Sequence, residues 1–232
     1  MTVNSSNQPG SRQQLPQNVW QELCSLGPEQ RYRAGSRMLR QGDSGTHLLA
    51  LTEGLVKVIR REEGGETTLL AFRGPGDLLG EVAVFDNRAR IADVVALRPC
   101  KAVVLEAHRF QAFVERRGLL MELMRQTLGR LRESDLRHAE LMTLPLCVRL
   151  ARSLVRLVDL TTPLPAGDAP LRLTGLTQEE LAQAIGVTRN AVVGGLQQLR
   201  EAGAVETARR AITIRDMEAL RFWAQAETIN GL

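Results

Sequence analysis

Arg189 and Asn190 are adjacent side chains whose chemistry matches the exposed edges of base pairs. In the major groove of DNA, a guanidinium pairs with O6 and N7 of guanine, and a carboxamide pairs with N6 and N7 of adenine. Both residues follow Thr188, a residue type that favours the N-cap of a helix. The three residues therefore predict a helix that presents base-reading groups in its first turn.

The pattern after Asn190 predicts how that helix packs. Val192, Leu196 and Leu199 recur at steps of four and three, which places them on one face of the helix. The opposite face carries Arg189, Asn190, Val193, Gly194 and Gln197. We expect the first face to be buried and the second to meet DNA. The Gly194-Gly195 pair costs about 1 kcal/mol per glycine relative to Ala, which indicates a close backbone approach or a softened helix.

A shorter helix is expected immediately before this one. Thr177 and Glu180 have the T-x-x-E spacing of a capping box, and Gly186 favours a tight break. Two short helices joined by a glycine-containing turn are typical of a helix-turn-helix when the second helix starts with Arg and Asn. We expect the first helix to support the DNA-reading helix.

The residues after the two helices favour a wing. Residues 205–207 and 211–214 predict the strands of a small hairpin, and the 208–210 turn between them is basic. Asp216 is expected to cap a last helix that runs through about Ala226. Together these patterns predict one set of DNA-contacting residues: Thr177, Gln178, Thr188, Arg189, Asn190, Val193, Gly194, Gln197, Arg209 and Arg210.

Charge is compatible with a nucleic-acid partner but does not dominate the C-terminal region. The chain of 232 residues has a formal net charge of +4 and a pI of about 9.5. Residues 145–232 contain ten arginines against nine carboxylates, a net charge of only +1. Affinity for DNA must therefore come from the local placement of arginines.

Cysteine and histidine are too dispersed to indicate a metal site or a disulfide framework. The six residues are spread over the chain: Cys24, Cys100, Cys147, His47, His108 and His138. Metal ligands usually occur in close pairs such as CxxC, which this sequence lacks. We therefore expect no metal, and no ligand set like that of a β-roll metalloenzyme. The sequence predicts a protein that is not an enzyme.

The N-terminal half predicts a β-roll. Residues 1–14 are polar and lack periodicity, which favours a disordered tail, and residues 15–26 predict a short helix. From residue 31 to 106, short alternating runs are separated by glycine-containing turns, the pattern of an antiparallel barrel or roll with room for a small molecule. No apolar run approaches the ~20 residues of a membrane span, so we expect a cytoplasmic protein.

A long helix is predicted over residues 119–142. Seven residues recur at alternating steps of three and four: Met121, Met124, Leu128, Leu131, Asp135, His138 and Met142. This is the spacing of a coiled-coil seam and favours a homodimer through residues 119–142. A helix buried against its own roll would show a similar stripe. Pro145 suits the first turn of the next helix, so residues 142–144 form the expected hinge.

The order of roll, long helix, hinge, helix-turn-helix and wing resembles the CRP/FNR family of transcription regulators, over residues 15 to about 226. The most specific part is GDLLGEVAVFDNRARIADVVAL, residues 76–97, which is similar to the family's phosphate-binding cassette for cyclic nucleotides. In the family, a Gly-Glu pair precedes a short loop, an Arg, a Ser or Thr, and an Ala. Here Gly80 and Glu81 supply the first pair, and Arg90 and Ala92 stand at the end.

The resemblance implies a role for each cassette residue. Glu81 would accept a hydrogen bond from a ribose 2′-hydroxyl, and Arg90 would bind a cyclic phosphate through two charge-assisted hydrogen bonds. Backbone amides of residues 81–85, which include Val82, would add donors. Ile91 stands where the family has Ser or Thr, and the lost hydrogen bond costs about 1.5–3 kcal/mol. Three interpretations stay open: weak binding of cyclic AMP, binding of another nucleotide or anion, and a regulator without a ligand.

Two further departures concern the long helix and the reading helix. Ser134 and Asp135 occupy the positions where cyclic-AMP-responsive relatives place a Thr-Ser pair that contacts the purine from both subunits. Ser134 is expected to reach an adenine amino group, and the alternative is that both are exposed polar residues. Asn190 and Gly194 replace a Glu and an Arg of relatives that read a TGTGA-type half-site, so we expect a different half-site.

These observations predict an α+β protein in three parts: a tail (residues 1–14), an effector-sensing antiparallel β-roll with a dimerisation helix (15–142), and a winged helix-turn-helix domain (143–232). We expect a homodimeric, sequence-specific transcription regulator modulated by cyclic AMP or another cyclic nucleotide, although no cofactor is certain. Promoter DNA and RNA polymerase are the expected partners, and a membrane is not.

The alternative is a ligand-independent or a redox- or haem-responsive regulator of the same fold. The oxygen-sensing branch of the family needs several N-terminal cysteines for an iron–sulfur cluster, and Cys24 alone cannot supply them. A haem sensor would need an axial ligand such as His47 or His108.

Overall fold

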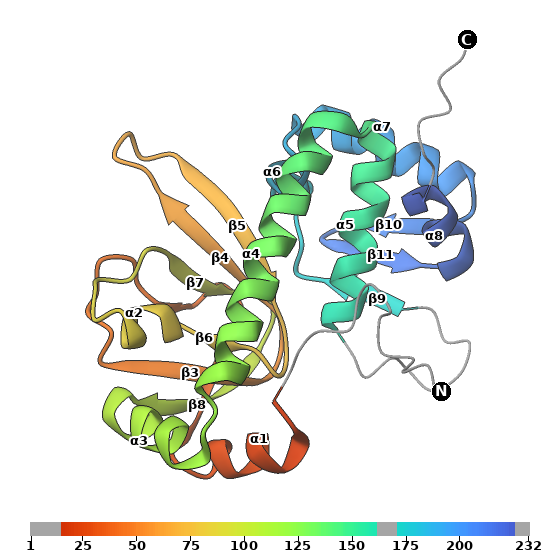
Figure 1. The fold of residues 1–232 in the computed structure, drawn as a ribbon. Helices are drawn as coiled ribbons and strands as arrows, with labels where there is room; N and C mark the ends of the chain where they lie inside the picture. Colours follow the sequence, from red (N-terminus) through yellow and green to blue (C-terminus); the bar gives the residue numbers. More distant parts are fainter. Residues whose placement is uncertain (1–14, 162–170, 226–232) are drawn as a thin grey trace.

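The computed structural model describes residues 15–161 and 171–225. In the N-terminal part, antiparallel strands form two sheets (Figure 1). The first sheet has the order β1-β8-β3-β6 and consists of β1 (Glu29–Tyr32), β3 (His47–Glu53), β6 (Leu78–Leu79) and β8 (Cys100–Glu106). The second has the order β2-β7-β4-β5 and consists of β2 (Arg37–Leu39), β4 (Val56–Arg61), β5 (Thr67–Arg73) and β7 (Asp93–Ala96).

Strand β3 shows why the two sheets stack. Its apolar run is buried on both faces, because successive side chains of a strand point to opposite sides. Leu49 and Leu51 belong to the core between the sheets, with residues of β2, β4 and β7. Leu48 and Ala50 belong to a second core, shared with helices α1 (Gln17–Cys24) and α3 (Ala107–Arg117). We call this two-sheet assembly with α1, α3 and the short helix α2 (Glu81–Phe85) the roll.

Helix α4 (Leu120–Thr143) leaves the roll and runs between it and the C-terminal helices (Figure 1). After a short link, Pro145 is the N-cap of α5 (Leu146–Leu160). The remaining elements are β9 (Leu171–Thr174), α6 (Gln178–Ile185), α7 (Arg189–Glu201), β10 (Val205–Ala208), β11 (Ala211–Ile214) and α8 (Met217–Gln225). We call the part from α5 to α8 the C-terminal unit.

The C-terminal unit is packed against the roll. Its core includes Leu55, Phe72 and Leu97 of the roll together with buried residues of α5, α6 and α7. Gly175 marks one close approach, because a Cβ atom there would lie 2.3 Å from the backbone oxygen of Leu97. Its φ of +85° is also one that other residues rarely adopt. Glycine is therefore required where the two parts meet.

The structure confirms the predicted fold class and most of the local patterns. The last predicted helix is present from Met217 to Gln225, and Asp216 Oδ1 accepts hydrogen bonds from the backbone N–H groups of Glu218 and Ala219. The wing differs in two ways. Its turn is the two-residue Arg209-Arg210 step, and β9 adds a third strand beside β11 that the sequence analysis did not predict.

Some expectations fall outside the described residues, namely the tail over residues 1–14, the loop residues 162–170 and the helix beyond residue 225. Within the described part of the chain, no helix is both long and apolar enough to cross a membrane.

Candidate functional site

A cavity of about 350 Å³ lies between residues 78–94, strand β5 and helix α4, and we call it the cassette cavity. Six of the seven ligand-binding residues predicted from the sequence line it: Gly80, Glu81, Val82, Arg90, Ile91 and Ser134. Asp135, the seventh, is exposed and is not among the lining residues of this protomer. The cavity therefore lies between the roll and the long helix α4, and both contribute to its wall.

Glu81 is held by a partner that the sequence analysis missed. Gly80 takes a left-handed conformation (φ 82°) as the N-cap of α2, and Glu81 starts this short helix with only 9% exposure. Arg130 of α4 donates hydrogen bonds to a Glu81 carboxylate oxygen and, at 3.2 Å, to Asp77 Oδ1. It also donates to the backbone oxygen of Leu78 at 3.1 Å. Burial disfavours the charged guanidinium, but Glu81 and Asp77 outweigh it and raise the pKa of Arg130.

Arg90 is turned toward the backbone of the roll. Its guanidinium donates to the backbone oxygen of His47 at 2.6 Å and to that of Gly80 at 3.4 Å, and the residue is 5% exposed. Burial lowers the pKa of Arg90, although Asp43 and Glu81 oppose the shift. Glycine is needed at position 80 because its φ of +82° is one that other residues rarely adopt, and a Cβ atom there would also lie 2.3 Å from the Arg90 guanidinium. The phosphate role expected for Arg90 remains a prediction, because carbonyl groups accept these donors in this conformation.

The lining of the cassette cavity contains four arginines against two carboxylates, Glu81 and Asp86. Besides Arg90 and Arg130, its lining includes Arg73 of β5 and Arg137 of α4. Arg73 donates to its neighbour's backbone oxygen, that of Phe72, at 2.8 Å. Burial lowers the pKa of Arg73, and Arg130 lowers it further. The excess of guanidiniums over carboxylates favours an anionic ligand, because a negative charge offsets the repulsion that remains among the guanidiniums.

The sequence held one indication of these extra cations. Arg130 and Arg137 are seven residues apart, one heptad, and neither belongs to the apolar stripe of the long helix. A heptad spacing places both on the same helix face. Arg73 carried no comparable indication, because it ends an ordinary apolar run.

The second candidate surface is the pair of helices α6 and α7. Thr177 and Glu180 form the predicted capping box, with Thr177 Oγ1 accepting from Glu180 N at 3.1 Å and Glu180 Oε2 accepting from Thr177 N at 2.7 Å. Gly186 follows in the left-handed conformation with φ 64°. Thr188 Oγ1 then accepts from Ala191 N at 3.3 Å and caps α7. Local polar contacts thus define where each of the two helices starts.

Helix α7 is two-faced as its periodicity predicts. Val192, Leu196 and Leu199 are buried. The opposite face is exposed over all five predicted positions: Arg189, Asn190, Val193, Gly194 and Gln197. Arg189 Nε donates to Gln178 Oε1 at 3.4 Å, which joins the start of α7 to the start of α6. Arg209 and Arg210 are exposed at the tip of the wing. The base-reading and phosphate-binding roles of these residues remain predictions.

The two glycines of α7 have different surroundings. A Cβ atom at Gly195 would lie 2.5 Å from Leu146 Cδ2 and 3.0 Å from Leu150 Cδ2, so this glycine allows α5 to approach. A Cβ atom at Gly194 would meet nothing within 4 Å. Only Gly195 is explained by packing within the chain.

The predicted seam of α4 lies open in the protomer. Its five apolar side chains are 48–75% exposed: Met121, Met124, Leu128, Leu131 and Met142. Asp135 and His138 of the same stripe are also exposed. The stripe is thus not buried against its own roll, and it leaves a helix-long apolar surface without a cover in the protomer.

Cysteine and histidine stay dispersed in three dimensions. Cys24, Cys100 and Cys147 are free thiols, and burial is the main cause that raises the pKa of each one. Across the described ranges, no three Cys, His, Asp or Glu side chains are arranged to hold a metal ion. Burial and Arg90 lower the pKa of His47, whereas His108 has a side chain 75% exposed. Neither histidine gains a feature that favours haem binding.

Both parts of the chain match known protein families. Residues 29–117 match the cyclic nucleotide-binding domain, and residues 148–223 match the Crp-like helix-turn-helix domain. The chain is 30% identical over 190 residues to the cyclic AMP receptor protein of Thermus thermophilus, which covers 82% of this chain and 84% of that protein. It is 29% identical over 188 residues to the CRP-like cAMP-activated global transcriptional regulator of Mycobacterium tuberculosis, which covers 80% and 83% respectively.

A solved structure of a related protein also matches this chain over most of its length. A CRP/FNR-family transcriptional regulator from Thermus thermophilus matches with a TM-score of 0.70 and 26% identity, covering 86% of this chain and 99% of that one. The Mycobacterium tuberculosis relative and the protein of the solved structure are both named as transcriptional regulators. With a cyclic nucleotide-binding domain followed by a DNA-binding helix-turn-helix, the chain belongs to the CRP/FNR family of transcription regulators.

Proposed function

We propose that this regulator is a homodimer whose affinity for promoter DNA changes when an anionic effector, a cyclic nucleotide or a related compound, binds in the cassette cavity. One observation carries the proposal. The cationic cassette cavity is bounded by α4, the same helix whose apolar seam is uncovered in the protomer. A ligand there would contact the dimerisation helix directly, and Leu131 belongs both to the seam and to the cavity wall.

The chemistry of the cavity suits a phosphate-bearing ligand. Arg90 and Arg130 supply guanidinium donors, which bind phosphate oxygens in pairs. Glu81 supplies the carboxylate that a ribose hydroxyl needs, provided that Arg130 shares or releases it. Ser134 adds a hydroxyl from α4, whereas Ile91 is 62% exposed and offers none. Cyclic AMP is the first candidate, because the relatives named above are a cyclic AMP receptor and a cAMP-activated regulator.

The dimer would place two copies of α7 side by side for two half-sites of DNA about one helical turn apart. The exposed face from Arg189 to Gln197 would read base edges, and Arg209 and Arg210 of the wing would bind phosphates. We place the boundary between the sensing and DNA-binding domains at residues 142/143, supported by the end of α4 at Thr143 and the N-cap at Pro145. A cytoplasmic location and contact with RNA polymerase follow from this role.

Calorimetry with cyclic AMP, cyclic GMP and cyclic di-GMP tests the effector, with Arg90→Ala as the matched variant. We expect one nucleotide to bind and the variant to lose about tenfold or more in affinity, the value of one charge-assisted contact. Binding unchanged in Arg90→Ala would reject the cavity assignment. A mobility-shift assay with promoter DNA at several salt concentrations tests DNA binding, since a regulator must show sequence-selective, salt-sensitive binding.

A ligand-independent regulator is the second candidate, and one observation favours it. The polar groups of the cassette cavity satisfy one another, because Arg130 bonds Glu81 and Asp77 while Arg90 bonds backbone oxygens. Such a cavity needs no ligand to compensate its charges. In that case DNA affinity would be identical with and without all three nucleotides, and Arg130→Ala would lower stability instead of ligand affinity.

A further inference from the structure

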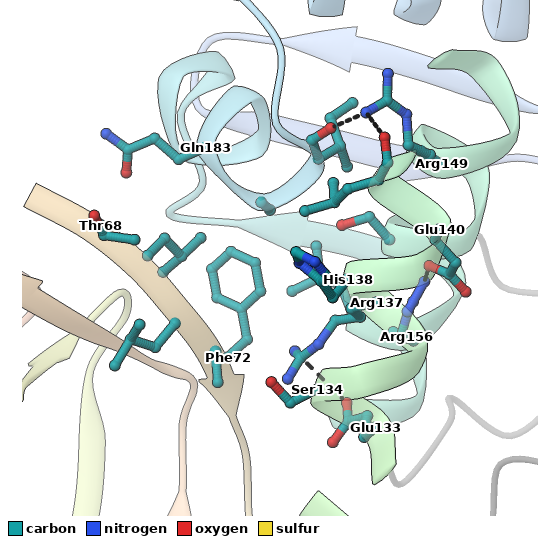
Figure 2. A pocket seen from close by; sticks show the side chains of 18 of the residues that line it. Thr68, Phe72, Glu133, Ser134, Arg137, His138, Glu140, Arg149, Arg156 and Gln183 are labelled. Carbon is teal, nitrogen blue, oxygen red and sulfur yellow. Dashed lines mark hydrogen bonds and ion pairs between the residues drawn. The ribbon is translucent and has the colours of Figure 1, made fainter. Parts of the chain in front are cut away.

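A second cavity, of about 290 Å³, lies where the roll, α4 and the C-terminal unit meet, and we call it the junction cavity (Figure 2). It is lined by residues of β5, α4, α5 and α6. Its α4 wall carries Glu133, Arg137, His138 and Glu140, and Arg156 faces them from α5. Of these side chains, Glu133, Glu140 and Arg156 have no role in the function proposed above, whereas Arg137 also lines the cassette cavity.

Glu140 holds α5 against α4 across the hinge. Its Oε1 accepts from Arg152 at 3.1 Å, and its Oε2 accepts from Arg156. Arg152 also donates from Nε to the backbone oxygen of Ala224 in α8, at 2.8 Å. The Glu140 carboxylate therefore ties the end of α4 to α5 and, through Arg152, to α8. We call Glu140, Arg152 and Arg156 the hinge cluster.

Arg137 borders both cavities. It lines the cassette cavity with Arg73 and Arg130, and it lines the junction cavity with Arg156. Its side chain is 24% exposed, and its ion pair is a long one, 3.7 Å to Glu133 one turn back on the same helix. Figure 2 shows this guanidinium beside Ser134 and Glu133, at the edge of the junction cavity. A cation held so loosely can respond to a charge placed on either side of it.

Like charges act on Arg137 from both directions. After burial and the opposing effect of Glu140, Arg137 is a further cause that lowers the pKa of Arg156. It also contributes to the lowered pKa of Arg73, in addition to burial and Arg130. Arg137 therefore repels Arg156 on one side and Arg73 on the other, and it lines the cavity on each side.

We propose that Arg137 transmits the occupancy of the cassette cavity to the hinge cluster. An anion bound beside Arg73 and Arg130 attracts the Arg137 guanidinium toward the cassette cavity. Its repulsion of Arg156 then falls, and the bonds of Glu140 to Arg152 and Arg156 strengthen. The ligand thereby shifts the population of orientations of the C-terminal unit relative to α4. This relay rests on the proposed function for its ligand, but the charge interaction it uses is present without one.

Three full-length variants test the relay. Arg137→Gln removes the charge, Arg137→Lys keeps it, and Arg132→Gln removes a charge from an exposed position on the same helix. DNA affinity is measured by fluorescence anisotropy at one salt concentration, with and without cyclic AMP. We expect the ligand to change wild-type affinity by about fivefold or more. In Arg137→Gln the ratio of DNA affinity with ligand to DNA affinity without ligand should fall below about twofold. The ligand-free affinity of this variant should shift toward the value of the liganded wild type.

The two controls separate charge from structure. Arg137→Lys and Arg132→Gln should both keep the wild-type ratio within about twofold, because each leaves the cation between the cavities in place. Calorimetry with cyclic AMP on Arg137→Gln shows whether the ligand still binds when the ratio is lost. Should Arg137→Gln not fold, Arg156→Gln removes the receiving guanidinium and carries the same expectation for the ratio.

A different result would reject the effector without rejecting the relay. If none of the three nucleotides binds the wild type, the proposed effector is wrong. The relay then still predicts that Arg137→Gln changes ligand-free DNA affinity by about threefold or more, and that this change disappears in a Glu140→Gln background, because the two groups are coupled. Identical behaviour of Arg137→Gln and Arg132→Gln in every measurement would overturn the relay.

Discussion

Lys57 Nζ lies 2.7 Å from Glu180 Oε1, and this ion pair joins strand β4 of the roll to the first turn of α6 in the C-terminal unit. The same carboxylate uses its other oxygen, Oε2, to close the capping box with Thr177. One side chain therefore both starts the first helix of the helix-turn-helix and fixes it to the roll. The contact adds a polar anchor to the apolar packing of Leu55, Phe72 and Leu97.

Replacing Lys57 by Met should loosen the contact between the two parts. We expect the free energy of unfolding to fall by about 1–2 kcal/mol, because Glu180, with a side chain only 11% exposed, loses a charged partner. The loss is smaller than for a fully buried pair, since the Lys57 side chain keeps 22% of its exposure. Urea unfolding followed by circular dichroism measures the change.

Lys101 provides the matched control, because it is the chain's other lysine. Its partner Glu53, at 2.6 Å, has a side chain 60% exposed, so Lys101→Met should change stability by less than about 0.5 kcal/mol. Equal effects of the two substitutions would show that the Lys57–Glu180 pair is no anchor.

Local patterns allowed much of this fold to be predicted. The capping box, the glycine break and the two-faced α7 depend on contacts within a few residues, so their spacing is visible in the sequence. The Lys57–Glu180 pair spans 123 residues, and the Arg130–Glu81 pair spans 49. Pairs of this kind depend on how the units pack, which periodicity does not specify. The resemblance directed attention to Glu81 and Arg90, but their present partners came only from the structure.

Placing a charge in the seam of α4 should prevent dimerisation. Leu128 is 48% exposed in the protomer, and the proposed dimer buries it. Leu128→Glu should raise the dissociation constant of the dimer by about tenfold or more, because an unpaired buried carboxylate costs more than about 1.4 kcal/mol. Sedimentation velocity over a range of concentrations measures this shift.

Leu136→Glu is the control for that experiment. Leu136 is 66% exposed on the same helix but lies outside the seam. Its replacement should leave the sedimentation profile unchanged. A wild-type protein that stays monomeric at high concentration would contradict the seam itself.

Alanine substitutions at Gly194 and Gly195 of α7 should have opposite effects on stability, because one changes helix propensity alone and the other also changes packing. Gly194→Ala should raise stability by up to about 1 kcal/mol, because its Cβ atom meets open space and Ala favours the helix. Gly195→Ala should lower stability by about 1–2 kcal/mol, since the Cβ atom would lie 2.5 Å from Leu146 Cδ2 and 3.0 Å from Leu150 Cδ2, so that packed side chains of α5 must move. Thermal unfolding of both variants gives the comparison, and a destabilised Gly194→Ala would mean that the exposed face of α7 is not open.

Replacing an arginine of α7 by Ala should change DNA binding in a different way from replacing an arginine of the wing. Arg189 is expected to read a base, so Arg189→Ala should weaken binding to the preferred site by about 1–3 kcal/mol and relax selectivity at one base pair. Arg209 is expected to bind phosphate, so Arg209→Ala should weaken binding to all sequences alike and reduce the slope of log K against log salt by about one.

The preferred site is first selected from randomised duplexes with the wild-type protein. Arg221→Ala, an exposed change on α8, is the control and should alter neither quantity. If Arg189→Ala leaves selectivity intact at every base pair, α7 does not read the major groove through its first turn.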